Sequence, residues 1–199
     1  MNLANKLTVF RVILVPIMVI FAYLPIEGKV LGVAIPMIIM DVIFIIASIT
    51  DKLDGYIARS RNQVTTFGKF LDPLADKILV LAAMVILVEK SLLPAWIPTI
   101  VLAREFIVSG FRLIAVEKGG LVIAASIWGK LKTVTQMIAL IFAFVDVGGF
   151  FKFVSGNLTG VVLVINIIAS VMMAISVVAT VFSGWDYLAK GKDLFKENK

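Results

Sequence analysis

The 199-residue sequence has no cysteine and no histidine, and only 16% of its residues are charged. Without cysteine there are no disulfides, thiolate nucleophiles or thiolate metal ligands, and without histidine there is no imidazole base or ligand. Any catalysis must therefore use carboxylates, lysine, arginine, tyrosine, serine or threonine. With 61% hydrophobic residues, the chain also has too few polar side chains to cover a water-soluble domain. The composition predicts an integral membrane protein and excludes a soluble globule.

The sequence contains several long apolar segments. A membrane-spanning helix needs about 20 mainly apolar residues, and six such segments are separated by short polar or Pro/Gly-containing breaks. Because unpaired backbone is costly in lipid, each segment is expected to be an α-helix. The sequence predicts an all-α integral membrane protein of six transmembrane helices, with no sheet and a single domain over residues 1–199. The expected helices cover residues 7–24, 30–59, 73–88, 94–116, 128–145 and 158–188.

The basic residues are distributed unevenly over this pattern. Six spans place both ends of the chain on one side of the membrane, and 16 of the 19 lysines and arginines fall on that side. Cytoplasmic loops of membrane proteins carry an excess of Lys and Arg, so the termini are expected to be cytoplasmic. The net charge of +6 lies at helix ends beside the membrane, where membrane lipids and phosphorylated substrates are nearer partners than nucleic acid. No nucleic-acid partner is expected.

Four aspartates lie in or beside the second and third apolar segments, near their cytoplasmic ends. Carboxylates at the edge of the hydrocarbon layer are costly and mark functional sites by default. Four such groups would repel one another, whereas two hard divalent cations satisfy them with oxygen ligands, which implies Mg²⁺ or Mn²⁺. A two-metal site clamps the attacking and leaving oxygens of a phosphoryl displacement. The alternative is that these aspartates cap helices and pair with nearby lysines and arginines. That interpretation can explain any one of them, but it explains the set of four poorly. The four are Asp51, Asp54, Asp72 and Asp76.

Their spacing places these groups on shared helix faces. On an α-helix, Asp51 and Asp54 fall within an arc of about 100° together with Gly55 and Ala58. Two carboxylates thus lie above two very small side chains, a face that can hold a cation and admit a flat group. In the second pair, Pro73 suits the first position of a helix. Asp72 would then be the N-cap, and Asp76 would follow one turn later.

The full spacing from Asp51 to Asp76 is D-x2-D-G-x2-A-R-x8-G-x3-D-x3-D. It matches without departure the signature of the CDP-alcohol phosphotransferase family, whose members are six-helix membrane enzymes, usually homodimers, with a polar active-site cavity open to the cytoplasmic side. Residues 5–11, 103–112 and 129–133 resemble the bacterial phosphatidylglycerophosphate synthases of this family. The resemblance covers nearly the whole chain. It implies a homodimer in the bacterial cytoplasmic membrane that transfers the phosphatidyl group of CDP-diacylglycerol to glycerol 3-phosphate.

The resemblance also implies a role for each residue of the motif. The four aspartates would ligate the two cations that hold the diphosphate of the CDP-lipid. Asp76 would also be the general base, and on chemical grounds a metal-adjacent carboxylate is the best base available in this chain. Gly55 and Ala58 would let the cytidine lie close to the helix, and Arg59 would neutralise phosphate charge. The residues expected to bind the CDP-lipid are Asp51, Asp54, Gly55, Ala58, Arg59 and Gly68.

Basic residues in the later segments are candidates for binding the acceptor phosphate. Arg104 lies near the middle of an apolar segment, where an unpaired charge is costly, so we expect it to face a polar cavity. Pairing with Glu105 is not expected, because adjacent side chains on a helix do not face each other. The other candidates compete with interpretations as topology signals or helix caps. They are Arg112, Lys130 and Lys132, with Asn5, Thr8 and Arg11 near the N-terminus.

Two alternatives stay open on the sequence alone. Another acceptor, such as inositol phosphate, would be served by similar cations. A cation or phosphate transporter would also carry carboxylates and arginines in its helices, but transporters usually place their sites near the bilayer midplane between repeated halves, and the Asp motif is not repeated. Asp41, deep in the second segment, is not explained by the motif.

Overall fold

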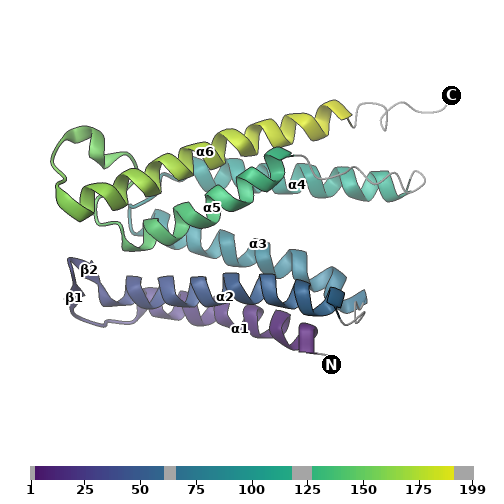
Figure 1. The fold of residues 1–199 in the computed structure, drawn as a ribbon, viewed down its shortest axis with the longest axis horizontal. Coiled ribbons are helices and arrows are strands. Elements are labelled where there is room, and N and C mark those ends of the chain that lie inside the picture. The colour runs from purple at the N-terminus through teal and green to yellow at the C-terminus, as the bar shows by residue number, and fades with distance from the viewer. Residues whose placement is uncertain (1–2, 61–65, 118–126, 191–199) are drawn as a thin grey trace.

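The computed structural model describes residues 3–60, 66–117 and 127–190. Within these ranges the side chains of some residues toward helix ends, among them Asp54, Ala58 and Arg59, lie outside the description. The described residues form six α-helices that run side by side along the long axis of the molecule (Figure 1), together with a short 3-10 helix, η1 (Lys152–Ser155). The six are α1 (Leu3–Tyr23), α2 (Ile35–Ser60), α3 (Thr66–Glu89), α4 (Trp96–Glu117), α5 (Ile127–Val145) and α6 (Gly160–Lys190).

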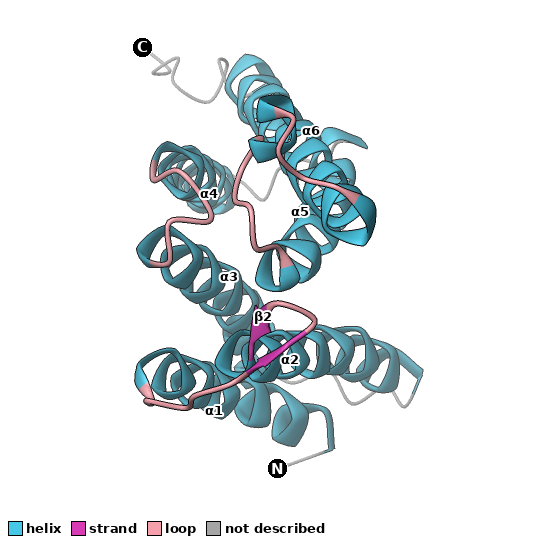
Figure 2. Ribbon diagram, turned by 90° about the vertical axis from the view of Figure 1, so that its left-hand side faces the viewer, coloured by secondary structure: helices cyan, strands magenta, loops and turns pink. Residues whose placement is uncertain are grey.

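The helices pack around one apolar core. α1 contacts α2 and α3, while α5 packs along α6, which also contacts α4. In the end-on view of Figure 2, α3 lies between α1 and α4. Met18, Phe44, Leu79 and Phe144 come from four different helices and are fully buried in this core. Many outward-facing side chains are also apolar, for example Ile20, which suits helices whose outer surface meets lipid.

A short antiparallel hairpin joins α1 to α2, where the sequence predicted no sheet. β1 (Lys29–Val30) pairs with β2 (Val33–Ala34), and the two turn residues, Leu31 and Gly32, have positive φ values of 52° and 87°. Positive φ at both central positions is the hairpin geometry that matches the twist of the strands. The prediction was wrong for this connection because its backbone groups pair across a tight turn outside the helices. The second helix therefore begins at Ile35, not at residue 30.

α3 begins at Thr66, well before the expected start at Pro73, which lies inside the helix. Proline removes one backbone N–H donor, yet the helix continues through it, so the N-cap predicted for Asp72 is wrong. Asp72 and Asp76 instead lie in the body of α3, one turn apart on a shared face, as their spacing predicted. The other predicted helices agree with the observed bounds to within a few residues.

The two ends of the bundle differ in what they carry. α1, α3 and α5 begin, and α2, α4 and α6 end, at the same end, which we call the motif end because the motif aspartates lie toward it (Figure 1). The hairpin lies at the opposite end. Within the described residues, three stretches are long and apolar enough to cross a membrane: Asn5–Tyr23, Ile127–Val145 and Gly160–Ala189. The chain is thus a membrane protein whose described residues are helical apart from the hairpin and the loops.

Candidate active site

Neighbouring turns of α1 contact two of the motif carboxylates. Arg11 is fully buried, and its Nη1 lies 2.7 Å from Oδ1 of Asp51 on α2. Thr8, three residues earlier, donates a hydrogen bond from Oγ1 to Oδ1 of Asp72 on α3 at 2.7 Å. Residues three apart on a helix are neighbours, so α1 brings the carboxylates of α2 and α3 to one region of the bundle. Asn5, one turn before Thr8, is also buried.

Asp76 has an oxygen that the described protein does not satisfy. Its Oδ1 is buried and makes no hydrogen bond to any residue that the structure describes. A buried polar atom without a partner is costly, and more so if it carries charge. Asp76 therefore has the property expected of a group that receives a proton or a cation from outside the protein.

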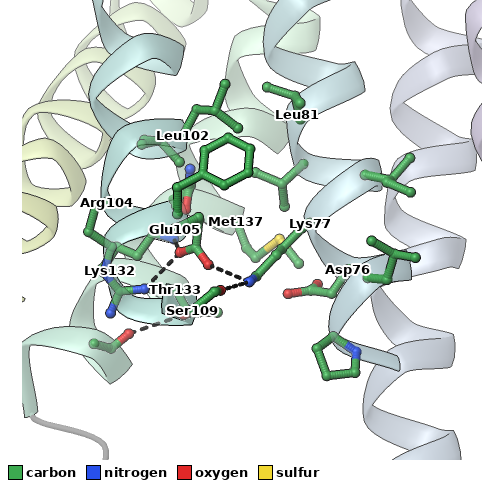
Figure 3. Close-up of a pocket in the computed structure, with 18 of the residues that line it drawn as sticks. Asp76, Lys77, Leu81, Leu102, Arg104, Glu105, Ser109, Lys132, Thr133 and Met137 are labelled. Atoms are coloured by element: carbon green, nitrogen blue, oxygen red, sulfur yellow. Dashed lines mark hydrogen bonds and ion pairs between the residues drawn. The ribbon is translucent and has the colours of Figure 1, made fainter. Parts of the chain in front are cut away.

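A cavity of about 900 Å³ lies between α3, α4 and α5, and Asp76 is part of its wall (Figure 3). Much of the lining is apolar and includes Leu81, Leu102 and Met137. The charged lining has more cations than carboxylates, which favours an anionic occupant. The cations are Lys77, Arg104, Arg112, Lys130 and Lys132, and the carboxylates are Asp76 and Glu105.

Glu105 is the centre of an ion cluster on the cavity wall. Its Oε1 lies 2.6 Å from Nζ of Lys132 and 2.7 Å from Nη1 of Arg104, and its Oε2 lies 3.4 Å from Nζ of Lys77. Lys77 also donates a hydrogen bond to Oγ of Ser109 at 2.7 Å. Figure 3 shows Lys77 and Glu105 extending toward each other, with Asp76 beside them. One carboxylate thus gathers cations from three helices while the cavity keeps an excess of positive charge.

The prediction that Arg104 does not pair with Glu105 was wrong. Adjacent residues leave a helix in different directions, but both side chains are long, and Lys132 of α5 holds the carboxylate within reach of the guanidinium. Arg104 does line a cavity, whose wall is largely apolar but also carries charged side chains. Sequence reasoning gave no role to Glu105 or Lys77, although a carboxylate in the middle of an apolar segment is itself a functional signal.

The residues predicted to bind the acceptor phosphate fall into two groups. Those of α4 and α5 line the cavity, where the structure brings Arg104, Arg112, Lys130 and Lys132 together. Those of α1 lie elsewhere, because Thr8 and Arg11 contact the motif carboxylates instead of the cavity cations. Of the residues predicted to bind the CDP-lipid, Asp51 and Gly55 lie on α2 and Gly68 is buried in α3. The side chains of Asp54, Ala58 and Arg59 lie outside the described residues.

The described carboxylates fit divalent cations that prefer oxygen ligands. Arg11 and Thr8 each engage Oδ1 of a carboxylate, so Oδ2 of Asp51 and Oδ2 of Asp72 can serve a metal, as can the buried Oδ1 of Asp76. Carboxylate oxygens are the ligands that Mg²⁺ and Mn²⁺ prefer. Among the described residues alone, without the Asp54 side chain, no three acidic groups form a metal-binding cluster.

Comparisons with known proteins agree with the motif. The family model for CDP-alcohol phosphatidyltransferases matches residues 1–182. A CDP-diacylglycerol–glycerol-3-phosphate 3-phosphatidyltransferase of Bacillus subtilis is 42% identical over 98% of this chain and 97% of its own length. Its namesake in Haemophilus influenzae is 40% identical over 99% of this chain and 97% of its own length. That of Escherichia coli K12 is 42% identical over 70% of this chain and 74% of its own length. The chain therefore belongs to the CDP-alcohol phosphatidyltransferase family.

Proposed function

We propose that the chain transfers the phosphatidyl group of CDP-diacylglycerol to sn-glycerol 3-phosphate, giving phosphatidylglycerophosphate and CMP. The observation that carries this proposal is the cavity, whose wall combines Asp76 with five cations. A small phosphorylated alcohol bound there has its hydroxyl near a carboxylate and its phosphate near fixed positive charge. The names of the curated relatives support the same reaction.

The reaction is a displacement at the β-phosphorus of CDP-diacylglycerol. The acceptor hydroxyl oxygen forms a bond to this phosphorus, the bond between the phosphorus and the bridging oxygen breaks, and CMP leaves with that oxygen. Asp76 accepts the hydroxyl proton. Its position on the cavity wall and its buried Oδ1, which accepts no hydrogen bond from the described residues, support this role.

Asp51, Asp54, Asp72 and Asp76 would hold two divalent cations, Mg²⁺ or Mn²⁺. When bound, such cations neutralise charge on the diphosphate and stabilise the attacking and leaving oxygens. The contacts made by α1 support an orienting role for its residues, because a donor on one carboxylate oxygen fixes the direction of the other. A direct role for Asn5, Thr8 and Arg11 in binding the acceptor phosphate stays a prediction. Contacts of the CDP-lipid with Gly55, Ala58, Arg59 and Gly68 stay predictions as well.

We also propose that all six α-helices cross the bacterial cytoplasmic membrane, with the motif end and the cavity facing the cytoplasm. α2, α3 and α4 have 26, 24 and 22 residues, which is long enough for a span of about 20 residues. The excess of lysine and arginine near this end supports the orientation. Assembly into a homodimer, expected from the family resemblance, stays a prediction.

Competition among acceptors tests the reaction. The purified protein, in detergent with Mg²⁺ and CDP-diacylglycerol, is given glycerol 3-phosphate, inositol 1-phosphate and serine at equal concentration, and the lipid products are identified by mass spectrometry. Phosphatidylglycerophosphate is expected to dominate. A larger yield from inositol 1-phosphate would assign a different acceptor within the family. Failure to release CMP with every acceptor would contradict the enzymatic proposal and favour a transporter.

A further inference from the structure

One side of α6 carries a buried polar stripe, although its sequence is that of an apolar span. Its six polar side chains recur along one side of the helix, and each is at most 1% exposed. Hydroxyl and amide groups buried to this extent need hydrogen-bond partners. The members of the stripe are Asn166, Ser170, Ser176, Thr180, Ser183 and Tyr187.

The half of the stripe farther from the motif end holds the connection between α5 and α6. Asn166 donates from Nδ2 to Oδ2 of Asp146 and to the carbonyl oxygen of Gly149, both at 2.7 Å. Ser170 accepts a hydrogen bond at Oγ from the backbone N–H of Phe151 at 2.8 Å. These contacts satisfy the backbone of a loop, so this half of the stripe has a structural role.

The half near the motif end contacts cavity residues instead. Arg104 donates from Nη2 to Oγ of Ser183 at 2.6 Å, and Arg112 donates from Nη2 to the hydroxyl oxygen of Tyr187 at 3.0 Å. Both guanidinium groups also lie over the ring of Tyr187, with their central carbons 5.9 and 5.8 Å from its centre, where cations are attracted to an aromatic face. Two residues one turn apart on α6 thus hold two arginines of α4.

We propose that Ser183 and Tyr187 are positioning residues that hold Arg104 and Arg112 in place for the acceptor phosphate and so set the affinity for the acceptor. An arginine side chain has many rotamers, and fixing it before binding reduces the entropy lost when it meets a phosphate. The inference rests on the proposed function, because it requires a phosphorylated acceptor in the cavity. Both residues lie beyond residue 182, where the match to the family model ends.

The experiment compares Ser183→Ala and Tyr187→Phe with a control from the same stripe, Thr180→Val. Tyr187→Phe keeps the ring and removes the hydroxyl group. Thr180 donates to the carbonyl oxygen of Ser176 on its own helix at 2.6 Å, so its loss leaves the arginine contacts in place. The KM for glycerol 3-phosphate is measured at saturating CDP-diacylglycerol, and the KM for CDP-diacylglycerol at saturating glycerol 3-phosphate.

Ser183→Ala and Tyr187→Phe should each raise the KM for glycerol 3-phosphate about tenfold. This value is the lower end of the range for the loss of a hydrogen bond to a charged group, and it applies because the arginine itself is retained. The kcat and the KM for CDP-diacylglycerol should change less than about twofold, since only acceptor binding is affected. Ser183→Thr, which keeps a hydroxyl, should stay near the wild-type KM. Thr180→Val should leave all three constants near wild type.

The inference is overturned if both KM values rise together, if kcat falls at unchanged KM, or if neither KM changes. If Ser183→Ala does not fold, the KM values of Tyr187→Phe alone test the inference, because this substitution nearly preserves the buried volume. The acceptor preference of the wild-type protein distinguishes failure of the proposed function from failure of the positioning role. If the wild type does not prefer a phosphorylated acceptor, the proposed function fails, and if it does while the variants keep its KM, only the positioning role fails.

Discussion

Replacing Glu105 by glutamine would show whether this carboxylate holds the cations of the cavity wall. The substitution keeps the shape of the side chain and removes its charge. Glu105 is 18% exposed, Arg104 is 13% exposed and Lys132 is 9% exposed, whereas Lys77 is 39% exposed. Solvent screens the pair with Lys77, so that pair contributes little. The effect should therefore come from the two buried partners.

Removing one partner of a buried ion pair costs about 3–5 kcal/mol, because the other charge stays buried without a counter-ion. Glu105 is not fully enclosed, so the free energy of unfolding should fall by the lower value, about 3 kcal/mol. In a chain of this length that corresponds to a fall in Tm of about 6–12 °C. A dianionic ligand would supply the missing negative charge. Glycerol 3-phosphate should therefore raise the Tm of Glu105→Gln more than it raises the Tm of the wild type.

The assay is thermal unfolding of purified protein in detergent, with and without glycerol 3-phosphate, followed by tryptophan fluorescence. Glu89→Gln is the matched control, since Glu89 is exposed at the opposite end of the bundle and accepts a hydrogen bond from Tyr23 at 2.7 Å. Its Tm should fall by less than about 2 °C, as expected for an exposed contact. An unchanged Tm for Glu105→Gln, or equal ligand shifts in variant and wild type, would refute the reasoning.

Three further predictions concern the reaction. Asp51→Asn, Asp54→Asn and Asp72→Asn should each lower CMP release more than about tenfold, because each removes a charged ligand of the proposed metal site, and rates above a tenth of wild type in all three would contradict that site. Asp76→Asn should slow turnover by about 10²–10⁴ with a much smaller loss of CDP-diacylglycerol binding, whereas proportional losses would make Asp76 chiefly a ligand. Arg112→Lys should raise the KM for glycerol 3-phosphate, because lysine lacks the planar fork that binds phosphate oxygens, and an unchanged KM would count against this contact.

Most of the fold could be predicted because long apolar runs and their breaks locate membrane helices well. The start of α3 could not, since Pro73 is compatible both with a first turn and with a helix interior, and only the packing of the preceding residues decides between them. The hairpin was missed because Val30 to Ala34 lead without a charged residue into the apolar run of the second segment, so their hydropathy does not show that the chain turns.

The motif aspartates could be predicted because charge in an apolar segment is conspicuous and their spacing is fixed along one or two helices. The partners of the cavity arginines could not be predicted in the same way. Ser183 is 79 residues from Arg104, and Tyr187 is 75 residues from Arg112, so each contact depends on how α4 and α6 pack. Hydroxyl groups also lower the hydropathy of a helix only slightly. A buried polar stripe within a strongly apolar segment is therefore nearly invisible in the sequence.

The division of charge among the helices has a physical reason. Among the described residues, the stretches that are apolar enough to be spans by composition alone lie in α1, α5 and α6, while α2, α3 and α4 carry most of the charges of the site. Each charge within a span costs about 3 kcal/mol on insertion scales, so it must be offset within the bundle. Arg11 offsets Asp51, and Glu105 offsets its neighbouring cations. Among the described residues, these pairs do not compensate the positive excess of the cavity or the buried Oδ1 of Asp76, and a protein that used these helices only as spans would have no reason to keep either. The acceptor phosphate, and the metal or proton at Asp76, are the groups that would satisfy them.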